Sequence, residues 1–233
     1  MLQLTSHLLK RFLWVTAACI FCYFFVDKPI AIFMYKINNF FYGGSTLGNA
    51  NLMSNLTTAS YLIIILFMAW YAYERVFQNK NTRFVRCIGI TTIAAGTAFF
   101  IKTNLQFFFG RIGPRYNDNQ SLLFSRHDTL YGFHLFQGGG SFPSGHMCVF
   151  TAMLLTPCYF YPHLRKLAYT LLGILAFLLI FGNYHFVSDV ISGTYLGAFI
   201  AMTLYQLNKL NAPRSGRDAP AAAIDLNQNE QLD

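Results

Sequence analysis

Six apolar stretches follow one another along the chain, each bounded by charged residues, glycine or proline. Each is close to the roughly 20 residues that a helix needs to cross the hydrocarbon core of a bilayer. The stretches cover residues 12–26, 56–73, 84–110, 144–161, 166–184 and 188–207. This pattern predicts an all-α protein built as a bundle of six transmembrane helices.

The first apolar stretch follows Lys10 and Arg11, so it could be a cleaved signal peptide or a retained anchor. It ends in Phe24-Phe25-Val26, which are bulky where a signal peptidase requires small residues. We therefore interpret it as an uncleaved anchor helix.

The remaining segments divide the chain into three predicted parts. Residues 1–58 hold the anchor and an outer-side interfacial segment with a polar loop from Gly43 to Asn55, and residues 59–207 form the membrane core. A second outer loop covers residues 111–143 within that core. Residues 208–233 are polar and are predicted to be a disordered cytoplasmic tail.

The composition supports a membrane protein. Hydrophobic residues make up 55% of the chain and charged residues 11%, whereas soluble domains carry about 25% charged residues. The mean hydropathy is +0.39. The net charge of +8 raises nucleic acid as a partner, but the basic residues are dispersed among the loops, so no nucleic-acid partner is predicted.

The basic residues instead indicate the orientation in the membrane, because Lys and Arg near span ends are retained in the cytoplasm. With both termini in the cytoplasm, most of the 17 basic residues lie on that side. The cytoplasmic set is Lys10, Arg11, Arg75, Lys80, Arg83, Arg86, Arg165, Lys166, Lys209, Arg214 and Arg217, and the outer set is Lys28, Lys36, Arg111, Arg115 and Arg126.

Ionisable residues inside or at the ends of spans are costly and point to function. Five such residues are Lys102, Arg111, His146, His185 and Asp189. Under the predicted orientation all five lie at or near the outer face. The sequence therefore predicts one site at that face.

Pro143 and Ser144 precede an apolar run and predict a helix start, where free N–H groups can bind an oxyanion. Gly145 would let a ligand approach the backbone, Ser144 could donate its hydroxyl, and His146 could exchange a proton with a leaving group. The alternative is a capped helix with an interfacial histidine.

His185 and Asp189 are four residues apart, so on a helix the carboxylate could orient the imidazole as a nucleophile or base. A water-satisfied polar pair is the alternative. Arg111 could hold phosphate oxygens with two hydrogen bonds, or it could extend to a lipid headgroup.

In its order of motifs the chain resembles the phosphatidic acid phosphatase type 2 family, which is related in fold to vanadium haloperoxidases. The family carries Lys-x6-Arg-Pro, then Pro-Ser-Gly-His, then Ser-Arg-x5-His-x3-Asp on a six-helix core. Here the second motif is complete at residues 143–146, and the third keeps His185 and Asp189.

This sequence departs from the family pattern at three cationic positions. The family's Lys falls on Gln106, the Arg of the first motif on Gly113, and the Arg of the third motif on Leu179. Lys102 lies one helical turn before Gln106 and could replace the Lys if its side chain reaches the site. Arg111, Arg115 and Arg126 are further candidates to compensate, and the sequence does not choose among them.

The resemblance implies a lipid phosphatase. His185 would attack a phosphate monoester or pyrophosphate to form a phosphohistidine, Asp189 would orient it, and His146 would act as acid and then base. Ser144, Gly145, Arg111 and Lys102 would hold the phosphoryl oxygens. No cofactor or metal is predicted, because the acidic residues are few and scattered.

Two other functions stay open on the sequence. The phosphoryl group could pass to another lipid, which would make the protein a phosphotransferase, or the fold could serve non-catalytic lipid binding or transport. The expected partners are a lipid phosphate substrate and the bilayer, with the oligomeric state undetermined. The expected location is a bacterial inner membrane with the active site facing the periplasm.

Overall fold

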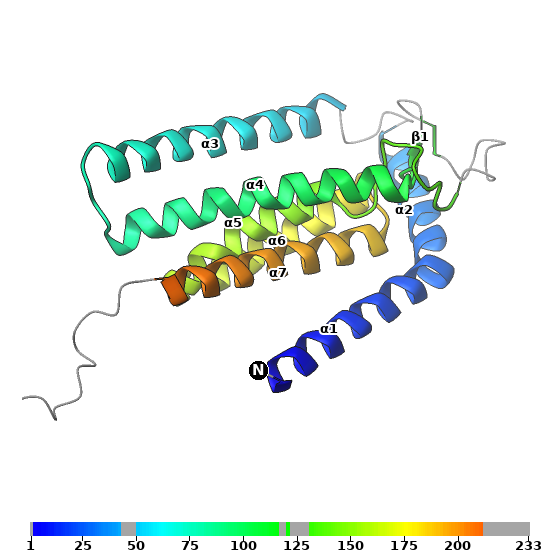
Figure 1. The fold of residues 1–233 in the computed structure, drawn as a ribbon. Coiled ribbons are helices and arrows are strands. Elements are labelled where there is room, and N and C mark those ends of the chain that lie inside the picture. The colour runs from blue at the N-terminus through cyan, green and yellow to red at the C-terminus, as the bar shows by residue number, and fades with distance from the viewer. Residues whose placement is uncertain (1, 43–49, 117–119, 122–130, 212–233) are drawn as a thin grey trace, which may run out of the picture.

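The computed structural model describes residues 2–42, 50–116, 120–121 and 131–211, and these residues form an all-α bundle, as predicted (Figure 1). A two-residue antiparallel pair, β1 (Arg115–Tyr116) with β2 (Gln120–Ser121), lies in the loop after α4. The helices are α1 (Leu2–Phe21), a π-helical turn (Cys22–Val26), α2 (Asp27–Tyr42), α3 (Ala50–Val76), α4 (Arg83–Phe109), α5 (Gly145–Phe160), α6 (Arg165–Phe181) and α7 (Val187–Asn211).

Each predicted span corresponds to a helix. Within the described residues, four helical stretches are long and apolar enough to cross a membrane: Leu8–Asn38, Arg83–Phe109, Pro162–Phe181 and Val187–Leu210. Helix α5 is apolar but has only 16 residues, and α3 is 27 residues long. Large apolar side chains are exposed on the outside of the bundle, among them Trp14, Phe24 and Phe100. The protein is an integral membrane protein.

The N-terminal half differs from the prediction at the start of α3. Helix α3 begins at Ala50, although a loop was expected as far as Asn55. The polar residues after Gly48 include no glycine or proline, so nothing local stops the helix from starting there. Residues 43–49 and the predicted tail from 212 lie outside the described residues.

Helices α5 and α7 pack closely through two glycines one turn apart. A Cβ on Gly193 would lie 2.4 Å from the Ser144 carbonyl oxygen, and one on Gly197 would lie 2.3 Å from the Cys148 carbonyl oxygen. Only glycine permits this approach, which is typical of helix contacts in membranes. The contact fixes the start of α5 beside the start of α7.

Helix α4 ends in a turn that depends on Gly110. This residue has a φ of 55°, and a Cβ there would lie 1.9 Å from the His134 carbonyl oxygen. The chain then turns inward at Arg111, which is completely buried. The end of α4 and the starts of α5 and α7 therefore meet at one end of the bundle, where the predicted site residues lie.

Candidate active site

A cavity of about 210 Å³ lies at this end of the bundle, and it contains four of the seven predicted site residues: Lys102, Gly145, His146 and His185. They come from α4, from the first turn of α5 and from the turn that precedes α7. The full lining is Tyr61, Lys102, Gln106, Gly145, His146, Val149 and His185. Residues far apart in the sequence thus surround one small cavity.

The two histidines face each other across this space. Their ring centroids are 6.0 Å apart, with the ring planes inclined at 69°. His185 is only 9% exposed, whereas His146 is half-buried near the start of α5. A group held between the rings would be accessible to both imidazoles.

The His185–Asp189 pair forms differently from the prediction. His185 precedes α7, which begins at Val187, so the two residues do not share one helix face. The Asp189 Oδ2 atom instead accepts a hydrogen bond from the Phe186 backbone N–H at 3.0 Å, which folds the turn back over the helix start. His185 Nδ1 then lies 3.6 Å from Asp189 Oδ2. Nδ1 is therefore the ring nitrogen nearer to the carboxylate, although it makes no hydrogen bond to any of the described residues.

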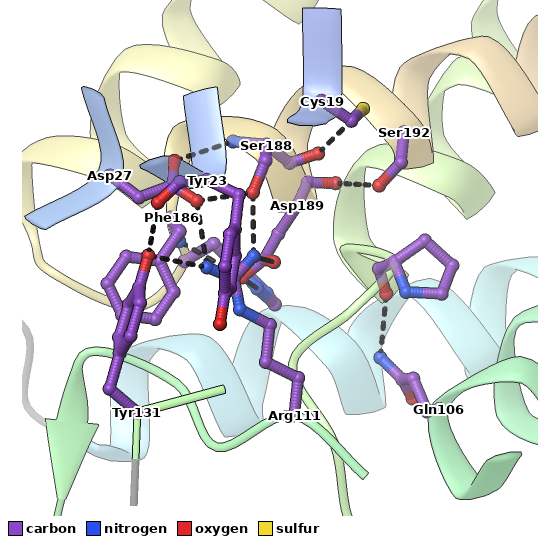
Figure 2. Close-up of polar contacts among 12 residues, drawn as sticks. Cys19, Tyr23, Asp27, Gln106, Arg111, Tyr131, Phe186, Ser188, Asp189 and Ser192 are labelled. Atoms are coloured by element: carbon purple, nitrogen blue, oxygen red, sulfur yellow. Dashed lines mark hydrogen bonds and ion pairs between the residues drawn. The ribbon is translucent and has the colours of Figure 1, made fainter. Parts of the chain in front are cut away.

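The side chain of Lys102 does extend to the start of α5. A Cβ on Gly145 would lie 3.3 Å from Lys102 Nζ, so the ammonium group lies against the backbone there. Lys102 Nζ also donates to Gln106 Oε1 at 3.3 Å. Gln106 Nε2 in turn donates to the Pro143 carbonyl oxygen at 3.0 Å (Figure 2). An ammonium group and a helix N-terminus are both electropositive, and together they favour an anion in the cavity.

Ser144 acts as the N-cap that the sequence predicted. It is buried, and its Oγ accepts from the Met147 backbone N–H at 3.4 Å. Its own N–H donates to the Asp189 carbonyl oxygen at 2.9 Å, which joins the second motif to the third. Ser144 does not line the cavity, and its hydroxyl lies at the helix cap.

Arg111 occupies a second polar cluster, which we call the Arg111 cluster and define as Asp27, Arg111, Ser188 and Asp189 (Figure 2). Arg111 NH1 donates to Asp189 Oδ1 at 2.7 Å and to Ser188 Oγ at 2.6 Å, and NH2 donates to Asp27 Oδ2 at 2.8 Å. Both carboxylates are completely or almost completely buried. The guanidinium thus lies between two acids.

This geometry does not support the predicted role of Arg111 as a direct phosphate ligand. Its two terminal nitrogens are used by the Arg111 cluster, and it does not line the cavity. Its Nε is buried and has no partner among the described residues. The physical reason is that carboxylates and phosphates present similar oxygen pairs to a guanidinium, so sequence alone did not distinguish them.

Aromatic rings enclose the guanidinium. Its central carbon lies 4.3 Å from the ring centroid of Phe186 and between 5.2 and 5.6 Å from those of Tyr23, Tyr131 and Phe133. Burial opposes the charge of Arg111, but Asp189 and Asp27 outweigh it, so the pKa of the guanidinium is raised. Burial raises the pKa of Tyr131 because it disfavours the charged phenolate. The Tyr131 hydroxyl donates to the Tyr23 carbonyl oxygen at 2.8 Å.

Sequence reasoning missed Asp27 and Tyr131. The sequence pattern ends the first apolar stretch at Val26, just before Asp27, whereas the helical stretch continues on both sides of Asp27, from Leu8 to Asn38. An acid in the middle of such a stretch is itself a signal of function. Tyr131 gave no comparable signal.

Two further features of this end of the bundle bear on chemistry. Within the described residues, no group of three or more His, Cys, Asp or Glu side chains is arranged to hold a metal ion. A larger and mainly apolar groove, of about 470 Å³, lies between α1, α4 and α7. It is lined by residues such as Phe12, Cys19, Leu105 and Leu196, and none of the predicted catalytic residues lines it.

The fold and the site define a helical membrane protein with two histidines and a lysine around one cavity. The sequence model of the PAP2 superfamily matches residues 84–212, which is more than half of the chain, and the protein belongs to this superfamily. The resemblance drawn from the motifs is therefore confirmed. Members of the superfamily are phosphatases, which supports a phosphoric ester hydrolase.

Among solved structures, the chain is similar to the first transmembrane PAP2 type phosphatidylglycerolphosphate phosphatase from Bacillus subtilis. The sequence identity is 16% and the TM-score is 0.48, and the match covers 87% of this chain and 98% of that chain. No curated protein matches the chain.

Proposed function

We propose that the protein is an integral-membrane lipid phosphatase that hydrolyses a phosphate monoester or pyrophosphate of a lipid through a phosphohistidine. The observation that carries the proposal is the cavity in which His146 and His185 face each other beside Lys102 and the start of α5. Membership of the PAP2 superfamily and the apolar spans support the lipid class of substrate.

In the first step, His185 Nε2 attacks the phosphorus atom and the bond to the leaving oxygen breaks. His146 donates a proton to that oxygen, which departs as an alcohol or a lipid monophosphate. In the second step, water gives a proton to His146 and attacks the phosphohistidine. The P–N bond breaks, its electron pair returns to His185, and inorganic phosphate leaves.

The other cavity groups hold the phosphoryl oxygens in this scheme. Lys102 and the N–H groups at the start of α5, including that of Gly145, neutralise charge as the transition state forms. Asp189 orients His185, and Ser144 fixes the first turn of α5. Arg111 acts through Asp189.

Metal independence is part of the proposal. Asp27 and Asp189 are both engaged by Arg111, so these carboxylates are not free to bind a cation. Activity retained in excess chelator and inhibited by vanadate is the expected result. Abolition by chelator, with recovery on adding a divalent ion, would overturn this part.

The deciding experiment is phosphate release by the purified protein from a panel of lipid phosphates. The panel includes phosphatidic acid, phosphatidylglycerophosphate, a polyprenyl diphosphate and lipid A. His185→Ala is the test variant and His163→Ala, which changes an exposed histidine in the loop before α6, is the matched control. We expect activity in the wild type and the control and none in His185→Ala. Equal inactivity of all three proteins on every substrate would reject catalysis.

The same assay distinguishes the phosphotransferase alternative. With a second lipid present, a phosphotransferase would move the phosphoryl group to that lipid, and inorganic phosphate would be released only in its absence. This result would identify transfer. Release unaffected by an acceptor lipid supports hydrolysis.

We further propose that both termini are cytoplasmic and that the cavity opens to the periplasm of a bacterial inner membrane. The distribution of basic residues supports this orientation. A reporter fused after Asp233 should be active only in the cytoplasm, and a periplasmic signal would reverse the orientation.

A further inference from the structure

Asp27 belongs to the part of the chain that precedes the superfamily match, yet it contacts the centre of the Arg111 cluster. The match begins at residue 84, and Asp27 opens α2. Its side chain is 1% exposed. It makes three polar contacts: Oδ2 accepts from Arg111 NH2 at 2.8 Å and from Ser188 Oγ at 2.5 Å, and Oδ1 accepts from the Ser188 N–H at 3.0 Å.

Through these contacts Arg111 binds two carboxylates, that of Asp189 and that of Asp27. Arg111 NH1 and NH2 are divided between Asp189 and Asp27. With both acids ionised, two negative charges surround one positive charge, so the cluster carries a net charge of −1. In a buried environment this charge acts over several ångströms with little screening.

The net negative charge of the Arg111 cluster would stabilise the positive charge that develops on His185 in the proposed reaction. When His185 Nε2 forms a bond to phosphorus, the imidazole ring gains positive charge. Asp189 Oδ2 lies 3.6 Å from His185 Nδ1, and its other oxygen is held by Arg111. Without Asp27, the positive charge of Arg111 would be balanced by Asp189 alone, and the cluster would offer His185 no net charge.

We propose that Asp27 is a positioning residue for His185. It fixes Arg111 and the start of α7 through its three contacts, and it shares the positive charge of Arg111, so that Asp189 Oδ2 can stabilise the imidazole. This inference rests on the proposed function. It also gives the N-terminal helices a part in the chemistry, beyond anchoring.

The N-terminal helices are attached to the core on both sides of Asp27. Before it, the Cys19 thiol donates to the Ser188 carbonyl oxygen at 3.6 Å. After it, Asn38 Nδ2 donates to the Phe181 carbonyl oxygen at 2.6 Å, and Asn183 Nδ2 donates to the Ala31 carbonyl oxygen at 3.2 Å. Asn38 therefore provides a matched control, because it attaches α2 without contacting the Arg111 cluster.

The test compares Asp27→Asn with Asn38→Ala in the full-length protein, using the lipid phosphate on which the wild type is most active. For Asp27→Asn we expect kcat to fall about tenfold and KM to stay within about twofold of the wild type. A tenfold change corresponds to an interaction free energy of the size measured between residues of one ion-pair network. Asn38→Ala should keep kcat within about twofold, even where it lowers the melting temperature. Asp27→Glu, which keeps the charge, should recover part of the kcat lost in Asp27→Asn.

A second measurement needs no substrate. Diethyl pyrocarbonate modifies imidazole nitrogens, and mass spectrometry gives the rate at His185 relative to the exposed His163 of the same molecule. The relative modification rate at His185 should fall at least about threefold in Asp27→Asn, which is a change of the size that coupled residues produce. In Asn38→Ala this rate should stay unchanged. If Asp27→Asn does not fold, Ser188→Ala removes the hydroxyl that joins Asp27 to Arg111, and the rate should again fall.

The outcomes distinguish this inference from the proposed function. Wild-type kcat and wild-type modification rate in Asp27→Asn would overturn the inference while leaving the phosphatase intact. Equal losses in Asp27→Asn and Asn38→Ala would reduce Asp27 to a general structural contact. A wild type without phosphatase activity, but with the expected slowing at His185, would reject the proposed function and retain the positioning of His185.

Discussion

Lys102 in α4 and Arg111, just after the end of α4, are two cations at the same end of the bundle, and their surroundings differ. Arg111 is completely buried between two carboxylates and enclosed by aromatic rings. Lys102 is half-buried in a cavity, its ammonium group bonds to the neutral Gln106, and within the described residues no carboxylate pairs with it. A cation already neutralised by protein acids organises the structure, whereas a cation held by neutral groups is available for an anionic ligand. The difference predicts distinct consequences for each residue.

The largest effect is expected from removing the buried cation. Arg111→Met leaves Asp27 and Asp189 buried without their counter-ion, which costs about 3–5 kcal/mol. For a chain of this length that lowers the melting temperature by roughly 10 °C. Thermal unfolding of the detergent-solubilised protein measures it, with the exposed Arg165→Met as control. A melting temperature equal to that of the control would show that Arg111 is not an organising cation.

The cavity cation should affect catalysis and not folding. Lys102→Met removes one of the groups proposed to stabilise the transition state, which typically costs about 10²-fold in kcat. The melting temperature should stay within a few degrees of the wild type, because no carboxylate among the described residues loses its partner. Lipid phosphate hydrolysis measures the first quantity, and exposed Lys166→Met is the control. Unchanged hydrolysis by Lys102→Met would remove the contrast between the two cations.

Moving the cavity cation along the helix sharpens the comparison. Lys102→Gln should lose activity much as Lys102→Met does, and the double variant Lys102→Gln with Gln106→Lys returns an ammonium group to the cavity from the family's usual position. Since both side chains line the cavity, we expect activity about tenfold above that of Lys102→Gln alone. No recovery would mean that the cavity requires the lysine at position 102 specifically.

The smallest effect is expected at the rim of the Arg111 cluster. Tyr131→Phe removes the hydroxyl that donates to the Tyr23 carbonyl oxygen, which costs about 1 kcal/mol, and it keeps the ring beside Arg111. The melting temperature should fall by a few degrees, with kcat within about twofold of the wild type. The exposed Tyr169→Phe should change neither quantity. A large loss of kcat in Tyr131→Phe would give the hydroxyl a catalytic part.

The helical spans could be predicted from sequence because each contains a long apolar run, although the first helical stretch continues past Asp27 to Asn38. Pro143 and Ser144 marked the start of α5 to within a residue, since capping is a local interaction. The start of α3 at Ala50 was missed because the polar residues there have a loop-like composition but no helix breaker. A polar composition therefore does not by itself prevent a helix, and in this segment the chain is helical from Ala50.

The site was predictable where its chemistry is contained in short motifs. His146, His185 and Lys102 meet in one cavity because the starts of α5 and α7 are adjacent in space. Asp27 was not predictable in the same way, because its partners Arg111 and Ser188 lie 84 and 161 residues away. Only tertiary packing brings these residues together, and it also determines that Arg111 faces carboxylates.

The π-helical turn at Cys22–Val26 sets the angular relation between α1 and α2. A π turn takes up one more residue than an α turn, and each residue of an α-helix corresponds to about 100° of rotation. Deleting one residue from this turn would rotate the face of α1 that carries Cys19 away from Ser188 while α2 stayed docked. The length of this five-residue segment, and not only its composition, therefore limits which N-terminal helices could be exchanged onto this core by recombination or by protein engineering.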